Sequence, residues 1–111
     1  MLLKDNIQRK NESTKIILKY PDKIPVIVNK CNNSPLNTLN KNKFLVEKDM
    51  KFMNFVFIIR KNIELDKSQS LFTLVNNTLV NSNQTMGEIY NDHKNEDGFL
   101  YVVYTSENTF G

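Results

Sequence analysis

Two side chains of this chain could take part in nucleophilic catalysis, the thiol of Cys31 and the imidazole of His93, and each is the single residue of its type. An enzyme that used them would need the imidazole beside the thiol, to act as its base. Cys31 follows a strand-like run, however, and a lone cysteine there is usually a small buried hydrophobic group. One Cys and one His do not make a metal-ligand cluster, and the chain has no glycine-rich phosphate loop. No metal or other cofactor is therefore expected.

The composition is that of one globular domain. The 111 residues include 40% hydrophobic and 24% charged residues, enough for a single core. The net charge of +3 would suit an anionic partner, but Lys and Arg are scattered rather than clustered with aromatic residues, so no nucleic-acid partner is expected. The single cysteine cannot form a disulfide within the chain, which suits a reducing compartment, and the sequence shows no signal peptide or membrane-spanning apolar run. We therefore expect a cytoplasmic protein.

The element around which the chain is organised begins with a short alternating run at residues 43–46. Side chains of a strand point alternately to opposite faces, so Lys43 and Leu45 face one way while Phe44 and Val46 face the other. Both faces thus carry apolar groups that need cover. The strand is either central in a sheet or at an edge beside two pockets, and the pattern alone leaves both alternatives open.

A long amphipathic helix follows this strand. Its main apolar stripe predicts that the helix lies across a sheet, and a second stripe lies beside the first. One face cannot hold both stripes, so the flank that carries Phe55 and Ile58 is expected to meet another element or to line a surface pocket. The main stripe contains Phe52, Phe55, Val56, Ile59 and Ile63, and the second contains Met53, Phe57 and Ile58.

The remaining patterns predict two more helices and three more strands. A helix over residues 3–19 ends at Tyr20-Pro21-Asp22, because the residue before proline is pushed out of helical geometry. Thr85 and Glu88 have the capping-box spacing that starts a short helix over 85–93. The other strands are predicted at residues 23–30, 71–75 and 100–105.

The order of these elements predicts an α+β fold. Two strands precede the long helix and two follow it, which is the ubiquitin-like β-grasp arrangement: a four-stranded sheet with a central helix. The expected organisation is an N-terminal helical extension over 1–19 and a β-grasp core with a C-terminal glycine tail over 20–111.

The residues of these segments resemble the ubiquitin-like modifiers of autophagy, the GABARAP-type family. The resemblance runs from about Glu12 to the last residue without a gap. It rests on Lys15-Ile16, Tyr20-Pro21-Asp22-Lys23-Ile24-Pro25-Val26-Ile27-Val28, Lys41 with Lys43-Phe44-Leu45-Val46, Ile59-Arg60-Lys61, Leu71-Phe72 with Val75-Asn76-Asn77, Thr85-Met86-Gly87, Tyr90, His93, Glu96-Asp97, Phe99-Leu100-Tyr101 and Phe110-Gly111.

The resemblance implies a modifier rather than an enzyme. Gly111 would be activated with ATP, passed as a thioester between the cysteines of an activating and a conjugating enzyme, and joined to the amine of phosphatidylethanolamine. A residue without Cβ suits this role, because it threads a narrow groove and leaves its carbonyl open to attack. A cysteine protease would remove any extra residues after Gly111 from a precursor and would also deconjugate the lipid-linked product. The protein would be cytoplasmic at first and then peripheral on autophagosomal or related membranes.

The resemblance also implies that the strand at 43–46 is an edge strand, to which receptor and adaptor proteins add a short peptide strand. Alternate peptide side chains would enter two pockets, which gives an aromatic-x-x-aliphatic motif. The aromatic pocket maps onto Glu12, Ile16, Pro25, Lys43, Leu45 and Phe99, and the aliphatic pocket maps onto Phe44, Val46, Met50, Phe55 and Ile58.

Charged residues around the two pockets bear on peptide preference. By the same resemblance, Lys23, Lys41 and Arg60 would attract acidic residues that flank the peptide motif. Two departures from the family pattern lie close by: Glu47 replaces the usual proline after the strand, and Gly98 replaces an aromatic residue that many members have before Phe99.

Two other functions remain as alternatives to the lipid-conjugated modifier. The first is a β-grasp interaction module that binds peptides without being conjugated, or a modifier that is attached to protein lysines. The second is a small enzyme that uses Cys31 and His93, which requires contact between those two side chains.

Overall fold

The computed structural model describes residues 2–106. The bounds of α1, α3 and the four strands fall within one residue of the predicted ones, and the predicted long amphipathic helix is present as α2, so the predicted order of elements is confirmed. In chain order the elements are α1 (Leu2–Lys19), β1 (Lys23–Lys30), β2 (Lys43–Glu47), α2 (Phe52–Asn62), β3 (Phe72–Val75), α3 (Met86–His93) and β4 (Leu100–Thr105).

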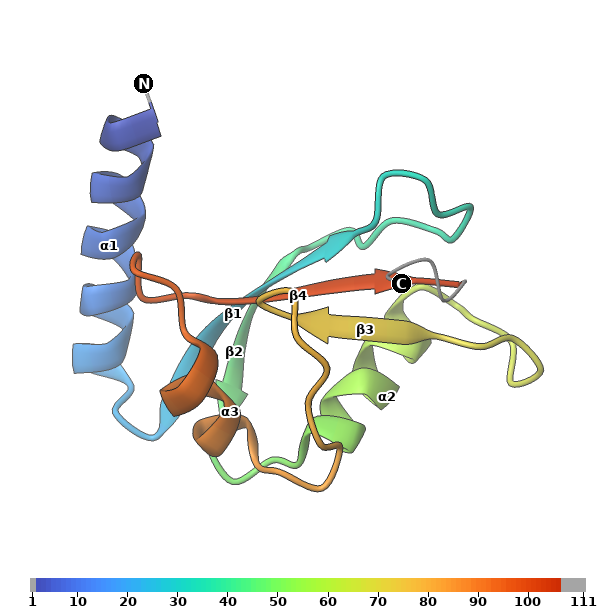
Figure 1. Cartoon of the computed structure of the whole chain (residues 1–111). Helices are drawn as coiled ribbons and strands as arrows, with labels where there is room; N and C mark the ends of the chain where they lie inside the picture. The colour runs from blue at the N-terminus through green and yellow to red at the C-terminus, as the bar shows by residue number, and fades with distance from the viewer. Residues whose placement is uncertain (1, 107–111) are drawn as a thin grey trace.

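The four strands form one mixed sheet in the order β2-β1-β4-β3 (Figure 1). β1 and β2 are the antiparallel arms of a hairpin, β1 and β4 are parallel, and β3 is antiparallel to β4. The strand at 43–46 therefore lies at an edge of the sheet, which decides between the two alternatives that its pattern left open. Four mixed strands with three helices give the predicted α+β class.

The main core lies between the sheet and α2. Val26 and Val28 of β1 and the even-numbered residues of β4 are fully buried on this face, against the apolar stripe of α2. Of the two alternatives predicted for the flank of α2, Phe55 takes the first: it is 0% exposed and its ring meets that of Phe44 in β2. The second stripe is partly a surface: Met53 and Phe57 are exposed.

The turn after β3 is left-handed, and the predicted capping box at the start of α3 is confirmed. Asn76 and Asn77 adopt left-handed geometry, with φ of 47° and 62°. At the start of α3, the Thr85 hydroxyl accepts from the Glu88 N–H at 3.2 Å, and the Glu88 carboxylate accepts from the Thr85 N–H at 3.0 Å. The Thr85 N–H and the Thr85 hydroxyl both donate to the Glu88 carboxylate and lower its pKa. The capping box thus fixes the first turn of α3.

The N-terminal helix α1 stands against β1, at one side of the molecule (Figure 1). It is fixed to the loop before β4 by Ser13, which is buried and whose hydroxyl donates to the Asp97 carbonyl at 2.6 Å. Gly98 lies directly beneath, with a positive φ of 87°, and a Cβ at this position would be 2.2 Å from the Ser13 oxygen. The helix approaches the loop this closely only because residue 98 is glycine.

The Asp97 carboxylate organises the same loop. One oxygen accepts from the Phe99 N–H at 2.9 Å and the other accepts from the Tyr101 hydroxyl. Burial and this hydrogen bond raise the pKa of Tyr101 from 10.0 to about 12. The loop, the first residues of β4 and α1 therefore form one connected unit.

We expect Gly98→Ala to lower the free energy of unfolding by roughly 1–3 kcal/mol, because it combines a strained φ with a clash against Ser13. Urea denaturation of the variant measures this loss. The clash is separated from the backbone strain by the double variant Ser13→Gly/Gly98→Ala. If the clash contributes, Gly98→Ala lowers the free energy of unfolding less in the Ser13→Gly background than in the parent. An equal loss in both backgrounds would contradict a role for the clash.

Because the pKa of Tyr101 is raised, the contribution of its hydroxyl to the free energy of unfolding depends on pH in the alkaline range. An unfolded tyrosine titrates near 10, so the raised folded value means that the contribution is complete below pH 10 and is lost as pH rises through about 12. We expect the stability difference between the parent and Tyr101→Phe to shrink over this window. Denaturation at pH 8 and pH 11.5 measures it, and a difference that does not change with pH would refute the assignment.

Candidate functional site

The exposed edge of β2 carries unpaired backbone groups. Next to this strand, Asn42 accepts a hydrogen bond from β1 at 2.8 Å, and Lys48 donates one to the chain before β1 at 3.0 Å. Antiparallel ladder bonds alternate along a strand, so the even-numbered residues bind β1 and the odd-numbered residues turn their N–H and C=O groups outward. The outward groups belong to Lys43, Leu45 and Glu47. They form a template on which another strand can pair.

A cavity of about 170 Å³ lies beside this edge, between α1 and β2. It is lined by all six residues that were predicted to form the aromatic pocket. Lys41 and Phe44, which were predicted for other roles, also line it. The six residues are Glu12 and Ile16 of α1, Pro25 of β1, Lys43 and Leu45 of β2, and Phe99 of the loop before β4.

The cavity has an apolar lining and a charged rim. Phe99 is buried, whereas Leu45 is 40% exposed. The Lys43 ammonium is 2.9 Å from a carboxylate oxygen of Glu12 and 5.9 Å from the centre of the Phe99 ring. This ion pair joins β2 to α1 across the rim. The arrangement can accept a flat apolar group and can bind polar groups at its edge.

Four of the five residues of the predicted aliphatic pocket belong to the core on the other face of β2 or pack against that core. Val46 and Phe55 are buried in the core, and Phe44 and Met50 pack against it. The rings of Phe44 and Phe55 meet edge to face with centroids 5.6 Å apart. Ile58 is half-buried on α2. Because Phe55 is completely covered, a ligand would touch its ring only after the neighbouring side chains moved.

The three cations that were predicted to attract acidic flanks differ in their surroundings. Lys41 is exposed and lines the cavity. Lys23 is 3.9 Å from a carboxylate oxygen of Glu47, which offsets its charge. The guanidinium of Arg60 donates to the carbonyls of Asp66 and Gln69 at 3.1 and 2.8 Å. In this structure Arg60 therefore holds the loop after α2.

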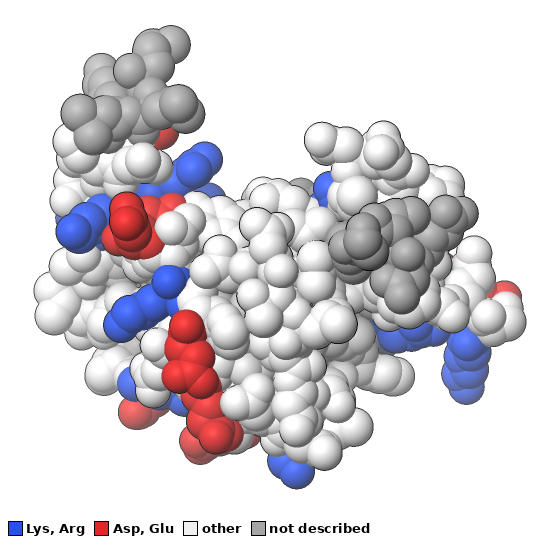
Figure 2. All heavy atoms as spheres, viewed as in Figure 1, with Lys and Arg blue, Asp and Glu red and all other residues white. Residues whose placement is uncertain are grey.

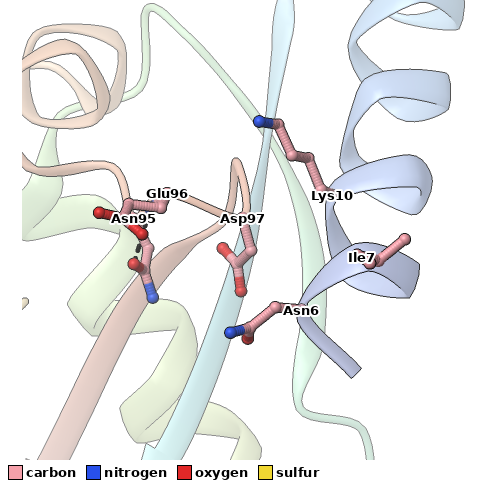
Figure 3. Close-up of a pocket in the computed structure, with 6 residues that line it drawn as sticks. All are labelled: Asn6, Ile7, Lys10, Asn95, Glu96 and Asp97. Carbon is pink, nitrogen blue, oxygen red and sulfur yellow. Dashed lines mark hydrogen bonds between the residues drawn. The ribbon is translucent and has the colours of Figure 1, made fainter. Parts of the chain in front are cut away.

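A larger hollow, of about 300 Å³, lies between residues 6–10 of α1 and the loop before β4 (Figure 3). No local sequence pattern predicts this hollow, because it depends on how α1 lies over a loop that is distant in the sequence. In Figure 3, Asn6, Ile7 and Lys10 belong to the helix and the other three labelled residues to the loop. Its lining is mixed in polarity and consists of Asn6, Ile7, Lys10, Asn95, Glu96 and Asp97.

The remaining residues singled out in the sequence do not form a catalytic or metal site within the described part of the chain. Cys31 and His93 are each half-buried, at the end of β1 and in the last turn of α3. Within residues 2–106, no three His, Cys, Asp or Glu side chains are grouped so that they could hold a metal ion. No helix in that range is long and apolar enough to cross a membrane. Gly111, the predicted conjugation site, lies outside the described residues.

Charged side chains on the face shown in Figure 2 are interspersed. Blue and red groups alternate along α1 and near α3, while the middle of the face is uncharged. On this face the protein therefore presents a mixed surface rather than a continuous basic field, although its net charge is +3.

Comparison with known proteins identifies the fold and the family. The family described as "Autophagy protein Atg8 ubiquitin like" matches residues 8–111. Autophagy-related protein 8h of Arabidopsis thaliana is 47% identical over 104 residues, which cover 94% of this chain and 87% of the relative. Autophagy-related protein 8 of Schizosaccharomyces pombe is 44% identical and covers 94% of this chain and 86% of its own.

A solved structure agrees with the sequence relatives. The crystal structure of Trypanosoma brucei ATG8 superposes with a TM-score of 0.85 at 38% identity, over 96% of this chain and 91% of the other. The predicted ubiquitin-like fold is thereby confirmed. This chain belongs to the Atg8 family of ubiquitin-like autophagy proteins.

Proposed function

We propose that this protein is a modifier that is joined through Gly111 to phosphatidylethanolamine and then recruits receptor and adaptor proteins by binding short aromatic-x-x-aliphatic peptides along β2. One observation carries the peptide-binding part. The outward backbone groups of an edge strand lie directly beside an apolar cavity that contains all six residues of the expected aromatic pocket.

The spacing of the motif follows from the two faces of the strand. A peptide that pairs with β2 exchanges backbone hydrogen bonds with Lys43, Leu45 and Glu47, which sets its register. Peptide side chains three positions apart point to opposite faces, because the strand period is two. The aromatic residue then enters the cavity beside α1. The aliphatic residue meets the other face, where Phe44 and Val46 lie.

The conjugation part rests on family membership and on Gly111. An activating enzyme adenylates the Gly111 carboxylate with ATP and releases pyrophosphate, and its cysteine thiolate then displaces AMP to form a thioester. After transfer to a conjugating enzyme, the amine of phosphatidylethanolamine attacks the thioester carbonyl, forms an amide and releases the thiol. A cysteine protease reverses the step by hydrolysing the amide. This chain is a substrate in each reaction and is not an enzyme itself.

The two parts together imply a change of location. Before conjugation the protein is cytoplasmic, and afterwards the two acyl chains of the lipid hold it at the surface of autophagosomal or related membranes. The peptide groove then brings its partners to that surface.

We expect Gly111→Ala to abolish the lipid-conjugated form, because a Cβ next to the reacting carbonyl obstructs the narrow catalytic groove. Intact-mass spectrometry of the protein from the membrane fraction of its own cells measures this. The parent should gain the mass of phosphatidylethanolamine and the variant should not. An added mass equal to that of a protein, or an unmodified parent on membranes, would contradict lipid conjugation and favour the interaction-module alternative.

We expect Leu45→Ala to weaken peptide binding about tenfold, since it removes an exposed apolar wall of the cavity. The probe is a synthetic peptide with acidic residues before a Trp-x-x-Leu core, which should bind the parent with about micromolar affinity. Titration calorimetry measures both. The matched control is Leu79→Ala, which truncates an exposed leucine after β3, at the opposite edge of the sheet. Equal binding by the parent and Leu45→Ala would contradict a groove at β2.

A further inference from the structure

Charge is distributed unevenly along the outer edge of β2. Odd-numbered residues of this strand share the face that carries the cavity, and each of them is exposed. Cationic groups lie at its beginning, where Lys41 and Lys43 line the cavity. At its end stands Glu47, with the apolar Leu45 between the two charges. Because Glu12 pairs with Lys43 at 2.9 Å, the positive charge before the cavity rests mainly on Lys41, and the charge after the cavity is the negative one of Glu47.

The carboxylate of Glu47 remains accessible to a partner. Its side chain is 60% exposed, and its contact with Lys23 in the adjacent strand is long, at 3.9 Å. Exposed ion pairs of this kind are weak in water, because both groups stay largely hydrated. A charge on a bound peptide could thus compete for Glu47 or be repelled by it.

An added peptide strand brings one defined residue close to Glu47; this step rests on the peptide groove proposed above. The aromatic pocket lies at Lys43 and Leu45, and the aliphatic set extends past the strand to Met50. A motif with its aromatic residue first therefore runs parallel to β2. The residue two positions after the aromatic one returns to the same face, about 6.6 Å further along, which is the spacing from Leu45 to Glu47.

We propose that Glu47 is a specificity-determining residue: it favours peptides with a basic residue two positions after the aromatic residue and disfavours peptides with an acidic residue there. The groove then selects acidic residues before its aromatic anchor, next to Lys41, and a basic residue after it. Because the interacting groups are at an exposed rim, the preference acts through Coulomb attraction and decreases as salt rises.

Two synthetic peptides test this preference. Both carry Asp-Asp before the aromatic residue, and their cores are Trp-Thr-Lys-Leu and Trp-Thr-Glu-Leu. We expect the parent protein to bind the lysine peptide roughly fivefold more tightly than the glutamate peptide at 50 mM salt, and the ratio to fall towards one at 0.5 M. Titration calorimetry of the full chain measures both affinities.

Variants at position 47 assign the preference to one side chain. Glu47→Gln should bring the two affinities together, and Glu47→Lys should invert their order. Asp92→Lys is the matched control: it makes the same change of charge at an exposed position in the last turn of α3, and it should leave the parent ratio unchanged. Glu47→Gln keeps the size of the side chain and therefore guards against a loss of folding in the lysine variant.

The outcomes separate this inference from the groove on which it rests. If both peptides bind equally and Leu45→Ala weakens both, the groove stands and the role of Glu47 is overturned. If neither peptide binds the parent, or if binding ignores Leu45→Ala, the groove itself fails. If Asp92→Lys changes the ratio of the two affinities as much as Glu47→Gln does, the assignment to Glu47 is also overturned.

Discussion

A buried hydrogen bond from the Ser13 hydroxyl to the Asp97 carbonyl holds α1 against the loop before β4, and the cavity beside β2 depends on this contact. Glu12 precedes Ser13 in the helix, and Ile16 follows it by about one turn, so the docked helix supplies both of these lining residues. The same loop leads to Phe99, which is buried at the cavity. One short contact thus sets the position of two walls that come from opposite ends of the chain.

The two faces of β2 serve different purposes. Val46 is buried in the core and Phe44 packs against it, which anchors the strand to α2 and to the sheet. Lys43, Leu45 and Glu47 stay outside, where they expose both their side chains and their unpaired backbone groups. An open edge strand with an exposed leucine invites unwanted pairing between copies, and charged neighbours reduce that risk. Lys43 and Glu47 therefore reduce unwanted strand pairing, and they place opposite charges at the two ends of the edge strand.

Local patterns predicted the helices and strands well, but they did not predict which side chains would be buried or which would form hydrogen bonds to other segments. Phe55 fits both the core stripe and its flank, and it is buried because the Phe44 ring packs edge-on against it. The guanidinium of Arg60 keeps its charge but also binds two carbonyls in the loop that follows the helix, which its position in the sequence does not reveal. Both outcomes depend on where a second segment lies, and the spacing of neighbouring residues carries no such information.

By itself the sequence determined the secondary structure, the cap at Thr85 and the alternation of β2, because each depends on residues within a few positions of one another. The order of the elements predicted the fold, and resemblance to a family added the edge position of β2 and a list of pocket residues. Only the tertiary structure decided how the cavity closes against α1 and that Glu47 stands beside Lys23. These features arise from packing between segments that are distant in sequence, where the free energy is set by the joint fit of their surfaces rather than by the pattern of any one of them.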